Sequence, residues 1–327
     1  MINTETNESK SPRSSSKALE TRESSGMLLL RFQNDLKKTG KSAHTVAAYR
    51  KDVQFFLEFC KINNIKIGEF SADFPEHWKS FLSEKGRVSQ SGIRRSLMSI
   101  RTFTRFLIST KQITHSGILE IKSPKQPSHD LLILPAKKIK LLLKTLKNQS
   151  KTGDSKAIRD YTIVLLLCQY GLKVTELCDL VWGDLLPVFS HPQYVLRVKG
   201  EKERLLYTDA STFHALELLK AARISLGLST QAEDSLWFGF QSQARFIQPV
   251  PLKRHSVKFI LYELTHTILG FPYNAESMRN SCIRNWLESG MSKEKTAQLA
   301  GLNTVFSLDR FSLKGRKVRK PKRQMKG

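Results

Sequence analysis

The chain has 327 residues, and 54 lysines and arginines against 29 aspartates and glutamates give it a formal net charge of +25. This length suffices for two domains with separate cores. No stretch approaches the ~20 uncharged apolar residues that cross a bilayer, and the serine-rich N-terminus lacks the apolar segment of a secretory signal. These features exclude a membrane-spanning protein and favour a polyanionic partner, nucleic acid first, because a polyanion relieves the self-repulsion.

The first 120 residues predict a tail and a small helical domain. Residues 1–25 are polar, which is typical of a disordered tail. Within the domain over 26–120, Ser42 or Thr45 is placed to cap an amphipathic helix. Its apolar face is formed by Tyr49, Val53, Phe56, Leu57 and Cys60.

Two further helices are expected over 75–82 and 91–109. In the second, Arg94, Arg101 and Arg105 lie at i, i+7 and i+11 and therefore share one face. Such a row either lies along a phosphate backbone or is a solvated helix face. This helix alone does not decide between the two.

Residues 121–135 carry three prolines in a basic segment without helical periodicity, which predicts an interdomain linker. A larger domain is expected over 136–311. Its first helices are expected over 136–148, at the apolar run 161–168, which Gly171 bounds, and over 174–180. A Trp182-Gly183-Asp184 turn and a β-hairpin with strands at 194–198 and 203–208 come next. Helices follow over 211–226, 255–269, 275–289 and 292–300, and residues 312–327 form a basic arm.

Cysteine and histidine usage indicates no metal site. The four cysteines are Cys60, Cys168, Cys178 and Cys282. They form no C-x-x-C pair and fall in apolar patterns, so we expect buried hydrophobes in a reducing compartment, the cytoplasm. The eight histidines have no ligand spacing, and no glycine-rich loop of the NTPase type occurs. The sequence therefore predicts no metal and no other cofactor.

Five segments, in this order, resemble those of the tyrosine recombinases, the phage-integrase family. They are SAHTVAAYRKDVQFFLEF (42–59), Arg159-Asp160 with the apolar helix that follows, YGLKVTELCDLVWGDL (170–185), VKGEKERLL (198–206), and SMRNSCIRNWLESGM with LAGLNTVFSLDRF (277–291 and 299–311). The resemblance spans 28–311. It implies a mainly α-helical fold with a small β-hairpin in the C-terminal domain, in the two-domain DNA breaking-rejoining architecture. A SAM-like core-binding domain and a catalytic-type domain would then close around duplex DNA as a C-shaped clamp.

The family's reaction, as the resemblance implies it, begins when a tyrosine hydroxyl attacks the scissile phosphate. Two arginines clamp the phosphate, a lysine protonates the leaving oxygen, and histidines donate hydrogen bonds. Two of these six positions are retained, as Lys199, with Lys202 a second candidate, and Arg279. Four are replaced: Lys173 at the first arginine, Glu276 at the histidine of H-x-x-R, Leu302 after Gly301, and Phe311 at the nucleophile.

The four replacements together predict a DNA-binding homologue that has lost strand cleavage. Lysine cannot make the planar two-point contact of arginine, and a carboxylate at Glu276 would repel a phosphate. Leu302 donates nothing and Phe311 has no hydroxyl, while no tyrosine follows Tyr273. Glu176 and Asp184 are expected to form caps or ion pairs rather than act as catalytic acids. The expected DNA contacts are Arg94, Arg101, Arg105, Lys173, Lys199, Lys202 and Arg279.

Two alternatives stay open. In the first, the chain is a working subunit of a hetero-oligomeric site-specific recombinase in which an active paralogue supplies the tyrosine. The resemblance implies dimers to tetramers on DNA, in which an inactive subunit has a place. Otherwise it is an RNA-binding protein on a similar scaffold, although it lacks an RNP-type aromatic strand and a GXXG loop.

Overall fold

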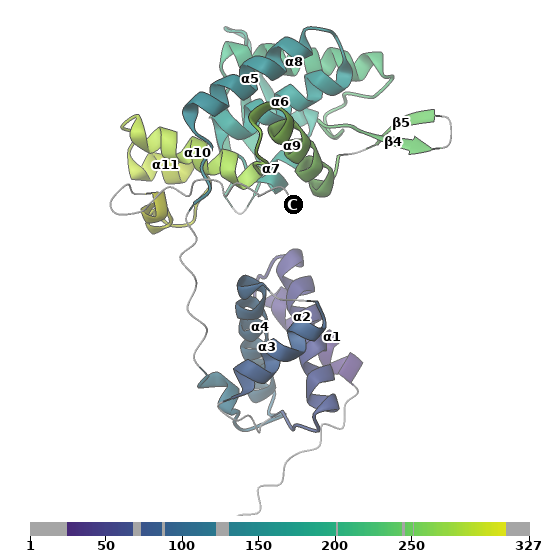
Figure 1. Ribbon diagram of the computed structural model, residues 1–327, viewed down its shortest axis with the longest axis vertical. Coiled ribbons are helices and arrows are strands. Elements are labelled where there is room, and N and C mark those ends of the chain that lie inside the picture. The colour runs from purple at the N-terminus through teal and green to yellow at the C-terminus, as the bar shows by residue number, and fades with distance from the viewer. Residues whose placement is uncertain are drawn as a thin grey trace, which may run out of the picture. The chain divides into compact units, whose positions relative to one another are not determined.

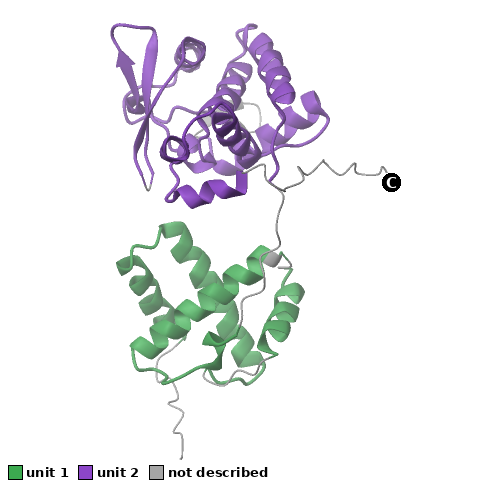
Figure 2. Ribbon diagram, turned by 90° about the vertical axis from the view of Figure 1, so that its left-hand side faces the viewer, with its two compact units in different colours: residues 1–128 green, residues 129–327 purple. Residues whose placement is uncertain are grey.

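The computed structural model describes residues 25–67, 73–86, 89–121, 131–200, 202–243, 246–250 and 252–311. The chain divides into two compact units, Met1–Ser128 and His129–Gly327, called unit 1 and unit 2 below and coloured separately in Figure 2. The predicted tail, apart from Ser25, most of the predicted linker and the basic arm over 312–327 lie outside the described residues.

Unit 1 is helical in its described part. It contains α1 (Ser25–Lys38), α2 (Ala43–Ile62), α3 (Phe74–Glu84), α4 (Gln90–Ser109) and a short 3-10 turn, η1 (Gly117–Leu119). Ser42 caps α2 by accepting a hydrogen bond from the Thr45 main-chain N–H. The core is rich in aromatic side chains around the fully buried Trp78, whose indole N–H donates to the Ser96 hydroxyl. The three helices expected from the apolar periodicity in this unit are confirmed.

Unit 2 combines helices with two small antiparallel sheets (Figure 1). Its helices are α5 (Ala136–Ser150), α6 (Ser155–Tyr170), α7 (Val174–Cys178), α8 (Ala210–Ser225), α9 (Arg254–Leu269), α10 (Ala275–Glu288) and α11 (Lys293–Leu299), with 3-10 turns η2 (Trp182–Asp184) and η3 (Val305–Phe311). The first sheet has the order β1-β2-β3 and consists of β1 (Leu185–Val188), β2 (Gln193–Val198) and β3 (Arg204–Tyr207). The second pairs β4 (Gly239–Gln243) with β5 (Phe246–Val250).

The expectation of a single hairpin followed only by helices is wrong in two places. The predicted hairpin is present as β2 and β3, but β1 pairs with the other edge of β2, and β4 and β5 form a second ribbon. β1 reads Leu-Leu-Pro-Val and so has no alternation of apolar and polar residues. Proline inside a short apolar run argues against a strand, although an edge strand such as β1 tolerates it.

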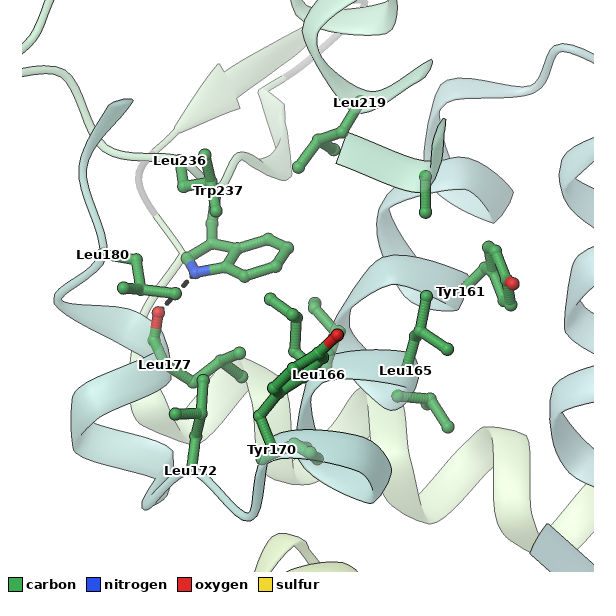
Figure 3. Packing of buried hydrophobic residues seen from close by; sticks show 14 of the residues in the cluster. Tyr161, Leu165, Leu166, Tyr170, Leu172, Leu177, Leu180, Leu219, Leu236 and Trp237 are labelled. Atoms are coloured by element: carbon green, nitrogen blue, oxygen red, sulfur yellow. Dashed lines mark hydrogen bonds between the residues drawn. The ribbon is translucent and has the colours of Figure 1, made fainter. Parts of the chain in front are cut away.

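The core of unit 2 surrounds α6, which is buried on nearly all sides and packs against α5, α8 and α10. Trp237 fills the space beside this helix, and its indole N–H donates to the Leu177 carbonyl (Figure 3). α6 ends at Gly171, which has a φ of 57°, a conformation that side-chain-bearing residues rarely adopt. This turn carries the chain directly into Lys173 and α7, and thereby places the candidate site at the C-terminal end of α6.

None of the helices in the described residues has the length and apolar character that crossing a bilayer requires. Three of the four cysteines are buried and Cys178 is half-buried, as expected for small hydrophobes. Burial raises the pKa of the Cys60 and Cys168 thiols to about 12.

Candidate functional site

The candidate site is organised around Glu176, a carboxylate that is only 6% exposed. Arg204 of β3 donates two hydrogen bonds to it, at 3.1 and 2.9 Å. The Lys173 main-chain N–H donates at 2.7 Å, which caps α7, and the Lys173 ammonium lies 3.8 Å from Oε1. Arg279 lies 4.0 Å from Oε2. One carboxylate thus holds three cationic side chains from three elements together.

The charge state of Glu176 follows from these contacts. Burial acts to raise its pKa, but the hydrogen bonds and positive charge of Arg204, with smaller contributions from Lys173 and Arg279, lower it below the ordinary glutamate range. Glu176 is therefore ionised at neutral pH. Its pairing with Arg204 and its capping of α7 agree with the expected role in caps and ion pairs.

Arg279, one of the two retained family positions, is buried on α10 and 6% exposed. Its guanidinium donates Nη1 to the Gly171 carbonyl and Nη2 to the Ala300 carbonyl. These bonds tie α10 to the end of α6 and to the end of α11. Burial is the largest influence on Arg279 and lowers its pKa. In this conformation the buried guanidinium links the ends of α6 and α11 to α10.

The turn after β2 brings the other retained position to the surface. Lys199 is 52% exposed, and its ammonium lies 2.9 Å from the buried carboxylate of Asp184. Asp184 also accepts from Arg197 and from the Val181 main-chain N–H, each at 3.2 Å. A Cβ atom on Gly200 would lie 3.6 Å from Glu176 Oε1, so this turn runs directly past the central carboxylate. Lys202 is exposed on the same turn.

Three of the four replaced positions, Glu276, Leu302 and Phe311, present no donor suited to a phosphate. Glu276 is exposed in the first turn of α10, where the helix dipole favours a carboxylate. Leu302 is half-buried and packs on an apolar cluster. Phe311, 4% exposed, belongs to that cluster, and the Arg310 guanidinium lies 4.9 Å from its ring centre. The aromatic ring of Phe311, where the resemblance expects the nucleophile, is therefore packed into the fold.

A cavity of about 560 Å³ opens beside the site between β3 and α11. Leu302 and Leu299 line it together with Lys202 and Arg204. The aliphatic side chain of Leu302 thus faces this cavity, and it cannot donate a hydrogen bond.

Arg204 is the organising residue that sequence reasoning missed. It lies on the inward face of β3, next but one to the buried Leu206, and also donates to the Leu299 carbonyl at 2.7 Å. A Cβ atom on Gly301 would lie 2.6 Å from Arg204 Nη1, so the chain passes very close to the guanidinium there. The available signal was an arginine at an inward position of an alternating strand, which requires a buried partner.

The arginine row expected on α4 lies in unit 1. Arg94 and Arg101 are half-buried, and Arg105 is exposed. Arg101 Nε donates to the Ile118 carbonyl at 3.4 Å. Burial and the positive charge of Arg105, four residues further along the helix, both lower the pKa of Arg101.

Two family models match the chain. Residues 29–111 match the phage integrase N-terminal SAM-like domain, and residues 133–306 match the phage integrase family. The tyrosine recombinase XerC of Myxococcus xanthus is 27% identical over 296 residues, which cover 87% of this chain and 92% of that protein. A tyrosine recombinase of Pseudothermotoga lettingae is 32% identical over 181 residues, 54% of this chain and 59% of that protein.

Solved structures share the fold at low sequence identity. The XerH site-specific recombinase bound to a palindromic difH substrate has a TM-score of 0.62 at 14% identity and covers 85% of this chain and 80% of that one. A lambda integrase dimer bound to a COC′ core site has a TM-score of 0.59 at 14% identity, covering 92% and 80%. A tyrosine-to-phenylalanine variant of the Tn1549 transposon integrase, in complex with transposon right end DNA, has a TM-score of 0.61 at 14% identity, covering 87% and 94%. The mainly helical two-domain architecture is thereby confirmed.

Proposed function

The chain belongs to the phage integrase family, and on that premise we propose that it binds duplex DNA as a recombinase homologue that does not itself cleave the strand. The observation that carries the proposal is Phe311. Its ring is buried with Ile283, Leu308 and other apolar residues at the position where the family resemblance expects the nucleophile. Without a hydroxyl, no phosphotyrosine bond can form from this residue.

The lysines of the candidate site suit phosphate binding. Lys173 and Lys199 are each in part exposed beside buried carboxylates, and Lys202 is exposed on the same turn as Lys199. We propose that these lysines contact the DNA backbone, with Arg279 behind them. The Tn1549 relative was solved with DNA as a tyrosine-to-phenylalanine variant, so that integrase does not need every tyrosine hydroxyl to hold DNA.

The domain assignment and the partners belong to the same proposal. Residues 26–120 would form the core-binding domain and 136–311 the catalytic-type domain, joined by 121–135 and followed by a basic arm over 312–327. The lambda integrase relative was solved as a dimer on its core site. We propose that this chain also acts in an assembly on DNA in the cytoplasm, next to a subunit that retains the tyrosine.

Covalent trapping tests the proposal directly. The purified full chain is incubated with fragmented DNA from its own source, and the sample is divided between native filter retention and an SDS-resistant assay. We expect salt-sensitive retention without SDS-resistant complexes. SDS-resistant complexes would show that another nucleophile is at work, and absence of native retention would remove DNA binding. Preference for single-stranded or structured RNA competitors would instead support the RNA-binding alternative.

The arginine row on α4 gives a second prediction. Plotted against the logarithm of the salt concentration, log K for DNA binding falls with a negative slope. Replacing the exposed Arg105 with glutamine should make that slope shallower by about 0.9, the contribution of one neutralised phosphate. Lys85→Gln is the matched control, because that ammonium is already paired with Glu58 at 2.7 Å. Salt-titrated fluorescence anisotropy on one duplex measures both variants. Equal slopes for the two variants would mean that Arg105 does not contact the backbone.

A further inference from the structure

α5 carries a row of lysines that the proposed function does not use. Lys137, Lys140, Lys144, Lys147 and Lys151 follow one another at intervals of three and four residues. This spacing keeps them on one face of the helix, and all five are exposed. The buried residues of α5, Leu142 and Leu146, lie on the opposite side and join the core of unit 2.

The row is uncompensated among the described residues. The helix contains no aspartate or glutamate, and none of these five lysines forms a hydrogen bond or ion pair in the described part of the chain. By contrast, Lys138 on a neighbouring face donates to the Leu269 carbonyl at 3.4 Å and lies over the Tyr273 ring. Like charges at these intervals destabilise a helix, and lysine in its first turn opposes the helix dipole. A bound polyanion would offset both effects.

The row leads away from the candidate site. α5 and α6 pack against each other and are joined by the short segment 151–154, so they run antiparallel. Lys151 therefore lies at the start of α6, whereas Gly171 and Lys173 lie at its other end. The 16 residues of α6 separate these ends by about 24 Å. Lys137, at the start of α5, lies at the Gly171 end of α6. Only a ligand on the part of the row from Lys144 to Lys151 is therefore distinct from a phosphate held near Glu176.

We propose that the lysine row on α5 binds the backbone of a second DNA segment, so that one chain can hold two duplexes. From Lys137 to Lys151 the row extends about 21 Å along the helix axis. That length matches the rise of about six base pairs of duplex, so several of the ammonium groups can reach backbone phosphates. Lysine offers a point charge on a flexible stem, so this contact is independent of DNA sequence.

A lipid surface fits this helix less well than DNA. Amphipathic helices bind membranes by inserting an apolar face, but the apolar face of α5 is already buried against α6 and α9. Leu141 is the exposed large hydrophobic residue of the helix, and a single leucine provides little insertion area. The charge complementarity without an available apolar face therefore favours nucleic acid.

A two-duplex capture assay with the full chain tests the row. A bead-bound duplex is saturated with protein, washed, and offered a labelled duplex of unrelated sequence. Lys140→Gln, Lys144→Gln and Lys147→Gln are combined in one variant, and the matched control carries arginine at the same three positions. We expect the wild type and the arginine variant to retain the second duplex. The glutamine variant should capture at least tenfold less of the second duplex than the wild type does. Its retention on the first duplex should change less than threefold.

The other outcomes overturn the proposal. If the wild type holds the first duplex but not the second, or if the glutamine variant captures the second duplex normally, the row is not a DNA site, although the proposed function stands. Equal loss of both duplexes would place the row in the primary site. Vesicles containing phosphatidylserine serve as a third probe, and loss of vesicle binding alone would assign the row to lipid. A wild type that holds neither duplex overturns this proposal and the proposed function together.

Discussion

Replacing Glu176 with glutamine should lower the free energy of unfolding of unit 2 by about 3 kcal/mol, because breaking a buried ion pair leaves its partner charge uncompensated. Arg204, itself buried, would lose a bidentate carboxylate and face an amide N–H₂ group at one of its two contacts. Arg279 would lose the negative charge 4.0 Å away. The neutral side chain keeps the size of glutamate, so the loss reports on charge and hydrogen bonding rather than on a cavity.

Urea unfolding of the full chain, followed by tryptophan fluorescence, measures this loss, since Trp182, Trp237 and Trp286 all lie in unit 2. Glu288→Gln is the matched control. Its carboxylate pairs with Arg284 at 2.8 Å but is half exposed, and such i, i+4 pairs contribute about 0.3–0.5 kcal/mol. Equal shifts for both variants would contradict the central position given to Glu176.

The contribution of the Glu176–Arg204 ion pair to the free energy of unfolding should depend on pH in one direction. Because the folded pKa of Glu176 is lowered, its contribution is fully present above the unfolded-state pKa and is lost as the pH falls through the folded value. The stability difference between the wild type and Glu176→Gln should therefore shrink in acid. The pKa of Asp160 is raised, chiefly by burial, and its contribution runs in the opposite direction. Comparison of the two proteins at each pH cancels that contribution.

The helices were predictable because their apolar residues repeat at the helical period. α2 and α4 follow that rule, and α6 ends at the glycine that the sequence marks. β1, β4 and β5 were not, because Leu-Leu-Pro-Val, Gly-Phe-Gln-Ser-Gln and Phe-Ile-Gln-Pro-Val each lack a regular alternation of apolar and polar residues. Such short strands are specified by pairing with a neighbour rather than by their own pattern.

Three residues of the candidate site could be named from short sequence segments, but the contacts between residues of the site could not. Lys173, Lys199 and Arg279 could be found because each stands at a fixed place in a recognisable segment. That Arg279 donates to the Gly171 and Ala300 carbonyls depends on three segments that meet only in the folded chain. Local sequence carries no signal for such a contact, and the same holds for the pairing of Arg204 with Glu176.

Restoring the missing hydroxyl alone, with Phe311→Tyr, should produce no SDS-resistant complexes above the wild-type background. Removing one transition-state donor typically costs about 10²–10³ in rate. Leu302 offers no donor, and Lys173 cannot clamp a phosphate at two points. These two defects together predict a rate about 10⁴–10⁶ below that of an intact site, and the carboxylate of Glu276 opposes the developing negative charge further. The assay for SDS-resistant complexes, with overnight incubation, measures this outcome.

The matched comparison restores all four positions at once, by combining Phe311→Tyr with Lys173→Arg, Glu276→His and Leu302→His. We expect this variant to form SDS-resistant complexes where the single variant does not, with native DNA retention showing that both are folded. Covalent complexes from Phe311→Tyr alone would mean that the hydroxyl is the only missing component and that Lys173 and Leu302 still support the chemistry. Because the Phe311 ring is already buried beside Leu308 and Arg310, the quadruple variant changes the chemistry of the site while the packing around residue 311 is retained.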